Sequence, residues 1–216
     1  MAIVYQDKYV KDVYNQIANH FTVTRVNNWL WITQFINEIK DKNLGSKPLI
    51  YDIGCGSGRN MKYLDCDFIG IDNCKNFIEI CRRQNLNVIE SDITNISLND
   101  DTADAIICIA VFHHLENDEN RIKCLIELKR LIKTDGKILL SVWSMNQPEK
   151  TRRKFKDYGD NIVLWNNRGK VYSRYYYIFK ISELLELFEK VGLKCINHYY
   201  DCGNEIFILD KEKNKN

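Results

Sequence analysis

A glycine-rich turn and two acidic side chains carry the clearest chemical signal in this chain of 216 residues. The turn follows a short apolar run and consists of Asp52, Ile53, Gly54, Cys55, Gly56, Ser57 and Gly58. Glycines in such a turn permit positive φ angles and let backbone N–H groups approach a ligand closely. Asp72 and Asp92 each follow a further apolar run, where a carboxylate could accept hydrogen bonds from ribose hydroxyls or an adenine amine. The pattern indicates a site for an adenosine-containing ligand.

The spacing of the glycines favours S-adenosylmethionine over NAD as that ligand. Dinucleotide sites use G-x-G-x-x-G, whereas here one residue separates the second and third glycines and Asp52 lies two residues before the first. Ile93 directly follows Asp92 and could pack on the adenine ring. Each acid taken singly could instead cap a helix or a turn, and for Asp92 the two interpretations are about equal.

A second group of residues could bind an anionic polymer. Residues 146–178 hold eight Lys/Arg and three Asp/Glu, a net charge of +5, so the rest of the chain carries −3. The same segment contains seven aromatic residues. Cations that hold phosphates and flat rings that stack on unpaired bases are what recognition of single-stranded RNA requires. We therefore interpret this segment as a substrate-binding surface.

The elements that must position these residues alternate along the chain between strands and helices. Apolar positions three and four residues apart predict N-terminal helices, and Pro48 prevents the second from continuing. The expected strands are Leu49–Ile53, Phe68–Ile71, Leu86–Glu90, Ala103–Ala110, Lys137–Trp143, Lys194–Tyr200 and Glu205–Leu209. The expected later helices are a short one after the glycine turn, Lys75–Gln84, Asn117–Ile132 and Ile181–Val191.

This order predicts an α/β fold with a seven-stranded, mostly parallel sheet. The loop between the last two strands, residues 201–204, is short enough to join only antiparallel neighbours. Five parallel strands followed by an antiparallel C-terminal hairpin is the order of a class I (Rossmann-like) methyltransferase. A nicotinamide dehydrogenase would continue with a parallel sixth strand.

Length and composition limit the remaining possibilities. A chain of this size fits a single domain over residues 1–216, with residues 1–45 as a helical cap. No apolar run approaches the ~18–20 residues that span a bilayer, and the first residues show no targeting pattern, so a cytoplasmic location and no membrane contact are expected. The eight cysteines include no C-x-x-C pair, which favours reduced thiols and no metal site.

With these residues in place, the chain resembles the methyltransferases that esterify 5-carboxymethyluridine at the wobble position of tRNA. The similarity starts at residues 9–25 (YVKDVYNQIANHFTVTR) and continues through the glycine turn, which all class I enzymes share. Residues 109–114 (IAVFHH) are more specific and add Ala110 to the cofactor-binding set. Residues 174–179 (RYYYIF) are the most specific, being similar to the family's R-Y-Y-H-L-F, although Tyr177 stands where the family usually has His.

The resemblance implies S-adenosylmethionine as cofactor, tRNA as substrate, and a small zinc-binding activator subunit as a partner. It implies substrate-binding roles for Arg25, His114, Arg174 and Tyr175. The alternatives without a role in binding are a solvent-exposed charge for Arg25 and a helix cap for His114. No catalytic base is expected, because a carboxylate nucleophile with a pKa near ~4 is already ionised at neutral pH.

Two other functions remain open at this level. A small-molecule methyltransferase, acting on a carboxylic acid or a quinone precursor, fits the glycine turn equally well but leaves the basic segment unexplained. A methyltransferase-fold subunit that binds RNA without turnover is opposed by the intact glycines and acids of the cofactor pattern.

Overall fold

The computed structural model describes residues 7–23, 29–43, 45–151, 155–167 and 169–212. The helical elements are η1 (Asp7–Lys11), α1 (Asp12–Val23), α2 (Leu30–Lys42), α3 (Lys75–Arg83), η2 (Phe112–His114), α4 (Asp118–Leu131), η3 (Glu149–Thr151) and α5 (Ile181–Lys190). The strands are β1 (Leu49–Ile53), β2 (Asp67–Asp72), β3 (Val88–Glu90), β4 (Ala103–Ile109), β5 (Ile132–Trp143), β6 (Gly159–Asn167), β7 (Lys170–Ile178), β8 (Leu193–Asp201) and β9 (Asn204–Lys211).

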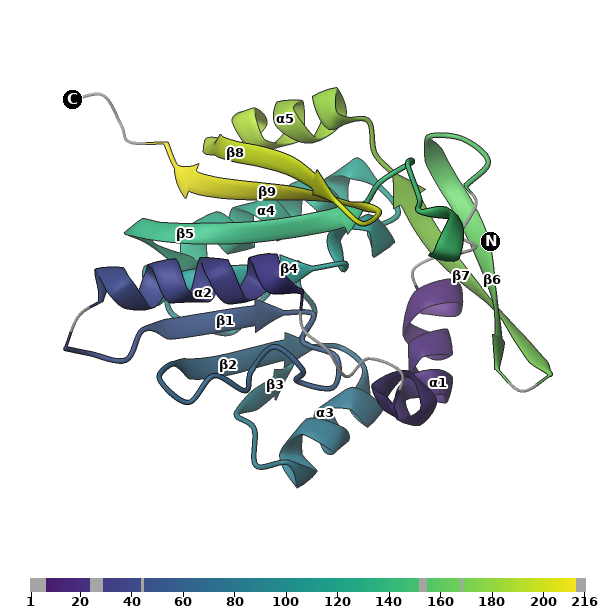
Figure 1. Ribbon diagram of the computed structural model, residues 1–216, viewed down its shortest axis with the longest axis horizontal. Coiled ribbons are helices and arrows are strands. Elements are labelled where there is room, and N and C mark those ends of the chain that lie inside the picture. The colour runs from purple at the N-terminus through teal and green to yellow at the C-terminus, as the bar shows by residue number, and fades with distance from the viewer. Residues whose placement is uncertain (1–6, 24–28, 44, 152–154, 168, 213–216) are drawn as a thin grey trace.

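Seven strands form one sheet in the order β3-β2-β1-β4-β5-β9-β8. The first five are parallel, β9 is antiparallel to β5, and β8 is antiparallel to β9. This arrangement confirms the predicted seven-stranded, mostly parallel sheet with a C-terminal hairpin (Figure 1). Parallel neighbours bring the carboxyl ends of β1, β2, β3 and β4 to one edge, which is where α/β sheets bind ligands.

Apolar side chains cover both faces of this sheet. On one face, α2 packs Ile32, Phe35, Ile36 and other apolar residues against β1, β4 and β5. On the other face, α4 and α5 bury Leu125, Leu128 and further side chains. Burial of both faces explains why β1 and β4 are mostly apolar and buried at nearly every position, without an alternating pattern.

The segment after the glycine turn differs from its prediction. No helix forms there; Gly58 has a φ of +72°, and the N–H of Met61 donates to the Gly58 carbonyl in a turn that does not propagate. A helix needs repeated φ angles near −60°, so a residue fixed at positive φ cannot belong to its first turn. The chain reaches β2 through consecutive turns instead.

A separate two-stranded sheet of β6 and β7 stands at the end of the molecule next to α1 (Figure 1). The register pairs Asn161 with Tyr176, Val163 with Arg174, and Trp165 with Tyr172. Residues paired in this way share one face of a hairpin, and the alternate residues share the other. The basic, aromatic segment therefore has two faces, only one of which meets the pocket described next.

Candidate functional site

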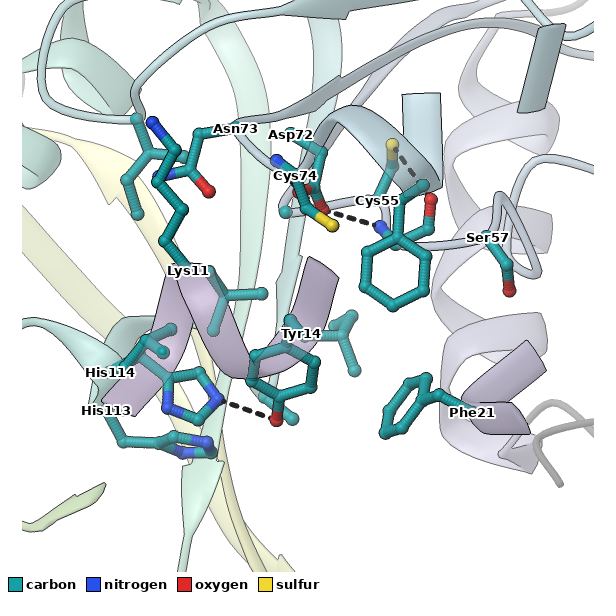
Figure 2. Close-up of a pocket in the computed structure, with 18 of the residues that line it drawn as sticks. Lys11, Tyr14, Phe21, Cys55, Ser57, Asp72, Asn73, Cys74, His113 and His114 are labelled. Carbon is teal, nitrogen blue, oxygen red and sulfur yellow. Dashed lines mark hydrogen bonds between the residues drawn. The ribbon is translucent and has the colours of Figure 1, made fainter. Parts of the chain in front are cut away.

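One pocket lies at the carboxyl edge of the parallel strands and is lined from four directions. The glycine turn and β2 form one wall, the end of β4 with η2 forms another, and α1 and β7 complete it. Figure 2 shows Lys11 of η1 with Tyr14 and Phe21 of α1, facing Asp72 and Cys55 on one side and the two histidines of η2 on the other. The pocket thus joins two predicted substrate residues, His114 and Arg174, to part of the predicted cofactor set: Gly54, Gly56, Asp72, Ile93 and Ala110.

The glycine turn is shaped for close approach to a ligand. The N–H groups of Gly54 and Cys55 both donate to the Ile71 carbonyl, at 2.7 and 3.0 Å, which ties the turn to β2. A Cβ on Gly54 would lie 2.3 Å from a Val111 methyl, whereas a Cβ on Gly56 would meet nothing within 4 Å. Gly56, at a φ of +53°, therefore leaves open space on the pocket side of the turn.

Asp72 closes this wall at the end of β2. One carboxylate oxygen accepts the N–H of Gly56 and the other accepts the N–H of Cys74, each at 2.8 Å (Figure 2). Burial raises the pKa of Asp72 to about 6, although these backbone donors oppose the shift. Each carboxylate oxygen keeps a further lone pair. The side chain therefore fits the hydroxyls of a ribose that enters the pocket.

Asp52 lies behind the turn rather than in the pocket wall. The side chain is 1% exposed, and burial raises its pKa to about 7, with the Arg59 charge opposing the shift. Neighbouring Arg59 and Asn60 do line the pocket, and the side-chain oxygen Oδ1 of Asn60 is buried without a hydrogen-bond partner among the described residues. An orphaned acceptor and a guanidinium side by side match the ammonium and carboxylate of an amino-acid group such as that of S-adenosylmethionine.

The third and fourth strands contribute unequally. Ile93 and Ala110 line the pocket, and Ala110 adopts a positive φ of +58° immediately after β4. Asp92 is exposed, and one of its oxygens accepts the N–H and the hydroxyl of Thr94, at 2.8 and 2.6 Å. The structure therefore places Asp92 outside the pocket wall, as the cap of a turn.

Arg174 brings a buried positive charge to the opposite end of the pocket. The side chain is 5% exposed, and its guanidinium carbon lies 5.4 Å from the ring centre of Tyr176 and 5.7 Å from that of Trp165. Its Nε is buried without a hydrogen-bond partner, and no ion pair of the described part of the chain includes this residue. A desolvated guanidinium in this state is suited to an anionic group of a substrate.

The other predicted substrate residues lie as follows. His114 lines the pocket, and its Nε2 is 3.2 Å from the hydroxyl of Tyr14 (Figure 2). Tyr175 points away from the pocket, and its hydroxyl donates to Asp160 at 2.6 Å. Tyr176, on the same face as Arg174, lines the pocket instead and stacks on Trp143 with ring centres 4.1 Å apart. Arg25 lies outside the described residues.

Tyr177, which stands where the family motif usually has histidine, also lies away from the pocket. Its ring packs under the guanidinium of Arg121 at 3.7 Å, and its hydroxyl donates to Glu183. Tyrosine in place of the usual histidine therefore changes the support of β7 rather than the chemistry of the site.

Sequence reasoning missed the contributions of Lys11, Tyr14, Phe21, Trp29 and Arg59 to the pocket. The apolar spacing that predicts this helix gives no sign that Tyr14 of α1 reaches the pocket. Its side chain packs edge-on against Phe21 and also reaches His114. For Arg59, its position directly after the third glycine was the available signal.

The described residues contain no cluster of three or more His, Cys, Asp or Glu side chains placed to hold a metal ion. None of their helices is both long and apolar enough to cross a membrane.

Comparison with known proteins places this fold and site in a family. Residues 51–140 match the family model described as methyltransferase domain. The tRNA (carboxymethyluridine(34)-5-O)-methyltransferase of Schizosaccharomyces pombe is 32% identical over 98% of this chain and 100% of its own length. The mouse protein named tRNA (carboxymethyluridine(34)-5-O)-methyltransferase ALKBH8 is 37% identical over 70% of this chain. That match spans only 22% of the mouse protein.

Among solved structures, an S-adenosylmethionine-dependent methyltransferase from Clostridium acetobutylicum superposes with a TM-score of 0.67. It covers 94% of this chain and 99% of its own at 12% identity, which supports the fold alone. The methyltransferase domain match confirms the predicted enzyme class and S-adenosylmethionine as the cofactor. With a full-length relative at 32% identity, the chain belongs to the family of the tRNA (carboxymethyluridine(34)-5-O)-methyltransferases.

Proposed function

We propose that this protein transfers the methyl group of S-adenosylmethionine to the carboxylate of 5-carboxymethyluridine at position 34 of tRNA, forming a methyl ester. The observation that carries the proposal is Arg174, a buried guanidinium in the same pocket as the glycine turn, with no carboxylate of the described chain paired to it. The names of the relatives that match support the same substrate.

Different residues of the pocket would bind the cofactor and the substrate. Bound S-adenosylmethionine supplies an electrophilic methyl group on a sulfonium. The glycine turn, Asp72 and Ile93 would hold its nucleoside, and Arg59 with Asn60 its amino-acid group. Arg174 would neutralise and orient the substrate carboxylate, while the stacked rings of Tyr176 and Trp143 would support the pocket wall beside it. Orienting two bound groups in line supplies much of the rate enhancement in such displacements.

No side chain is required as a base. The carboxylate is ionised at neutral pH. Burial, together with the Arg174 charge, lowers the pKa of His114 to about 3, so this imidazole is neutral. His113 is buried as well, and its Nδ1 accepts the backbone N–H of Trp143 at 3.0 Å, which gives it a structural task.

Replacement of Arg174 tests the proposal directly. We expect Arg174→Lys and Arg174→Ala to lower ester formation by at least ~100-fold, because an amine cannot form the paired hydrogen bonds of a guanidinium. Affinity for S-adenosylhomocysteine should stay within about threefold, since Arg174 lies at the other end of the pocket. The assay measures the methyl ester by mass spectrometry of nucleosides from tRNA that carries 5-carboxymethyluridine.

Lys190→Ala, an exposed change on α5, is the matched control. Equal loss of ester formation and cofactor binding in both Arg174 variants would show that the fold is damaged. Full activity in either variant would remove Arg174 from the site.

An activator subunit is the second part of the proposal. The strand β3 has only three residues, pairs with β2 alone and stands at an edge of the sheet, next to Ile93 of the pocket. A partner strand added there would extend the sheet and support the cofactor wall. We expect Val88→Pro to abolish stimulation of the activity by a zinc-binding partner, while the variant still folds in the absence of cofactor. A protein that is monodisperse and fully active alone would contradict this part.

Cytoplasmic location and a single domain over residues 1–216 belong to the same proposal. The former is supported by eight cysteines that are all free in the structure, as expected in a reducing compartment. Fractionation of cells that produce the tagged protein tests it.

A further inference from the structure

In each hydrogen bond around His114, the donor and the acceptor can be assigned in only one way. Its Nδ1 lies 2.8 Å from the backbone carbonyl oxygen of Tyr175. A carbonyl oxygen only accepts hydrogen bonds, so Nδ1 carries the proton. The ring is neutral because burial and the Arg174 charge lower its pKa to about 3. Nε2 of His114 is therefore an acceptor, buried at the end of the pocket.

This acceptor fixes the proton of Tyr14. The Tyr14 hydroxyl lies 3.2 Å from Nε2 of His114 and must donate to it, which uses its only proton. The Tyr176 hydroxyl, 3.3 Å away, must then donate to the Tyr14 oxygen. The chain of donors runs from Tyr176 to Tyr14, from Tyr14 to His114, and from His114 to the Tyr175 carbonyl. Each of the three side chains has one available role.

The Tyr14 oxygen keeps a lone pair as an acceptor, and Arg174 lines the same pocket, with its guanidinium carbon 5.4 Å from the ring centre of Tyr176. Burial lowers the pKa of Arg174, but charge interactions with Tyr176 and Tyr14 and a hydrogen bond to Tyr14 outweigh it, so the pKa is raised. Tyr14 comes from α1, whereas Arg174 and Tyr176 come from β7 and His114 from η2. One hydroxyl thus joins three elements beside the buried Arg174 guanidinium.

We propose that Tyr14 is a positioning residue: held by the acceptor Nε2 of His114, its hydroxyl oxygen orients the Arg174 guanidinium toward the anionic group of the substrate. The inference rests on the proposed function for the identity of that anion. It assigns His114 the task of a neutral acceptor and excludes it as a proton donor or a cation for the carboxylate.

The first test is spectroscopic and needs no substrate. In protein labelled with ¹⁵N-histidine, the His114 signals, assigned through His114→Gln, should show Nδ1 protonated and Nε2 unprotonated from pH 5 to 8. Tyr14→Phe should shift the Nε2 resonance because the hydrogen bond is lost, whereas Tyr176→Phe should leave it in place. A ring protonated at Nε2, or one that titrates between pH 5 and 8, would overturn the directed chain.

The second test is kinetic. Tyr14→Phe keeps the ring packed against Phe21 and Phe77 but removes the hydroxyl. We expect KM for tRNA that carries 5-carboxymethyluridine to rise about tenfold or more, as for the loss of one hydrogen bond to a charged group. The Kd for S-adenosylhomocysteine should stay within about twofold, and Tyr176→Phe should have a smaller effect because Arg174 keeps its Tyr14 acceptor.

Tyr200→Phe, which removes the hydroxyl of an exposed ring on β8, is the matched control. Unchanged KM and kcat in Tyr14→Phe would overturn the positioning role, as would an equal loss of cofactor affinity. Wild-type protein that forms no ester would instead overturn the proposed function, and the His114 signals then decide the directed chain independently.

Discussion

At the scale of single residues, the cofactor wall is built around two buried carboxylates. Asp72 is held by two backbone N–H groups, and Asp52 lies behind the turn, near Arg59. Both have pKa values well above the ordinary value of a carboxyl group, mainly because burial disfavours the charged form. A cationic ligand in this pocket would stabilise both anions, so the free protein carries an electrostatic cost that binding relieves.

This cost makes a prediction about stability and pH. The pKa of Asp52 is about 7 in the folded protein and ~4 in an unfolded chain, so the proton binds the folded state more tightly. Its contribution to the free energy of unfolding is fully present below pH ~4 and is lost as the pH rises through about 7. The side chain of Asp52→Asn is neutral at every pH. The free energy of unfolding of this variant, relative to that of wild type, should therefore rise by ~1–3 kcal/mol from pH 4.5 to pH 8.

Urea denaturation without cofactor at these two pH values measures the difference. Asp67→Asn, at an exposed position on β2, is the control. A wild-type stability curve parallel to that of Asp52→Asn would show that the Asp52 carboxyl is not perturbed in the folded state.

At the scale of elements, the short helix η2 depends on Arg121 of α4. This side chain is 4% exposed; its Nε and Nη2 donate to the Leu115 carbonyl and its Nη1 pairs with Asp118 at 2.7 Å. The guanidinium also covers the Tyr177 ring. One side chain therefore fastens the end of η2 to the outer face of β7, and so fixes His114 opposite Arg174.

We expect Arg121→Lys to lower the free energy of unfolding by ~1–3 kcal/mol, although the charge is retained. A lysine ammonium cannot reproduce the forked contact to the Leu115 carbonyl or the flat packing on Tyr177. Lys123→Ala removes only an exposed pair with Glu119, which solvent screens, and should leave the free energy of unfolding nearly unchanged. Urea denaturation compares the two variants, and equal small losses would refute the fastening role.

At the scale of the whole molecule, positive charge is concentrated in one segment. Residues 146–178 carry a net charge of +5, and the rest of the chain carries −3. In the structure, part of this segment forms the β6–β7 hairpin beside the pocket, with Lys156 and Lys170 exposed (Figure 1). A substrate with phosphates would be drawn to the end of the molecule where the pocket opens.

Affinity for tRNA should accordingly fall steeply with salt. About five phosphate contacts correspond to a slope of roughly −3 to −4 in a plot of log affinity against log salt concentration. Lys156→Glu with Lys170→Glu should weaken binding and flatten the slope, whereas Lys190→Glu on α5 should change neither. Fluorescence anisotropy with labelled tRNA measures both quantities. Weak binding that does not respond to salt would favour the small-molecule alternative.

The sequence by itself determined the class of fold and the position of the cofactor wall. Glycine spacing, the acid at the end of β2 and the strand order are local properties of the chain, so periodicity and turn chemistry were enough to predict them. Alternation along a strand also places Arg174 and Tyr176 on one face, so Tyr176 rather than Tyr175 could have been chosen from the sequence.

Only the tertiary structure decided which face of β7 meets the pocket and which residues of α1 complete it. That choice depends on the pairing of β6 with β7 and on the packing of a helix from the start of the chain against η2, residues that are a hundred positions apart. It likewise showed Asp92 as a turn cap and Tyr14 as the residue in contact with His114. Contacts at such separation are set by how the elements pack, and no local pattern of residues encodes them.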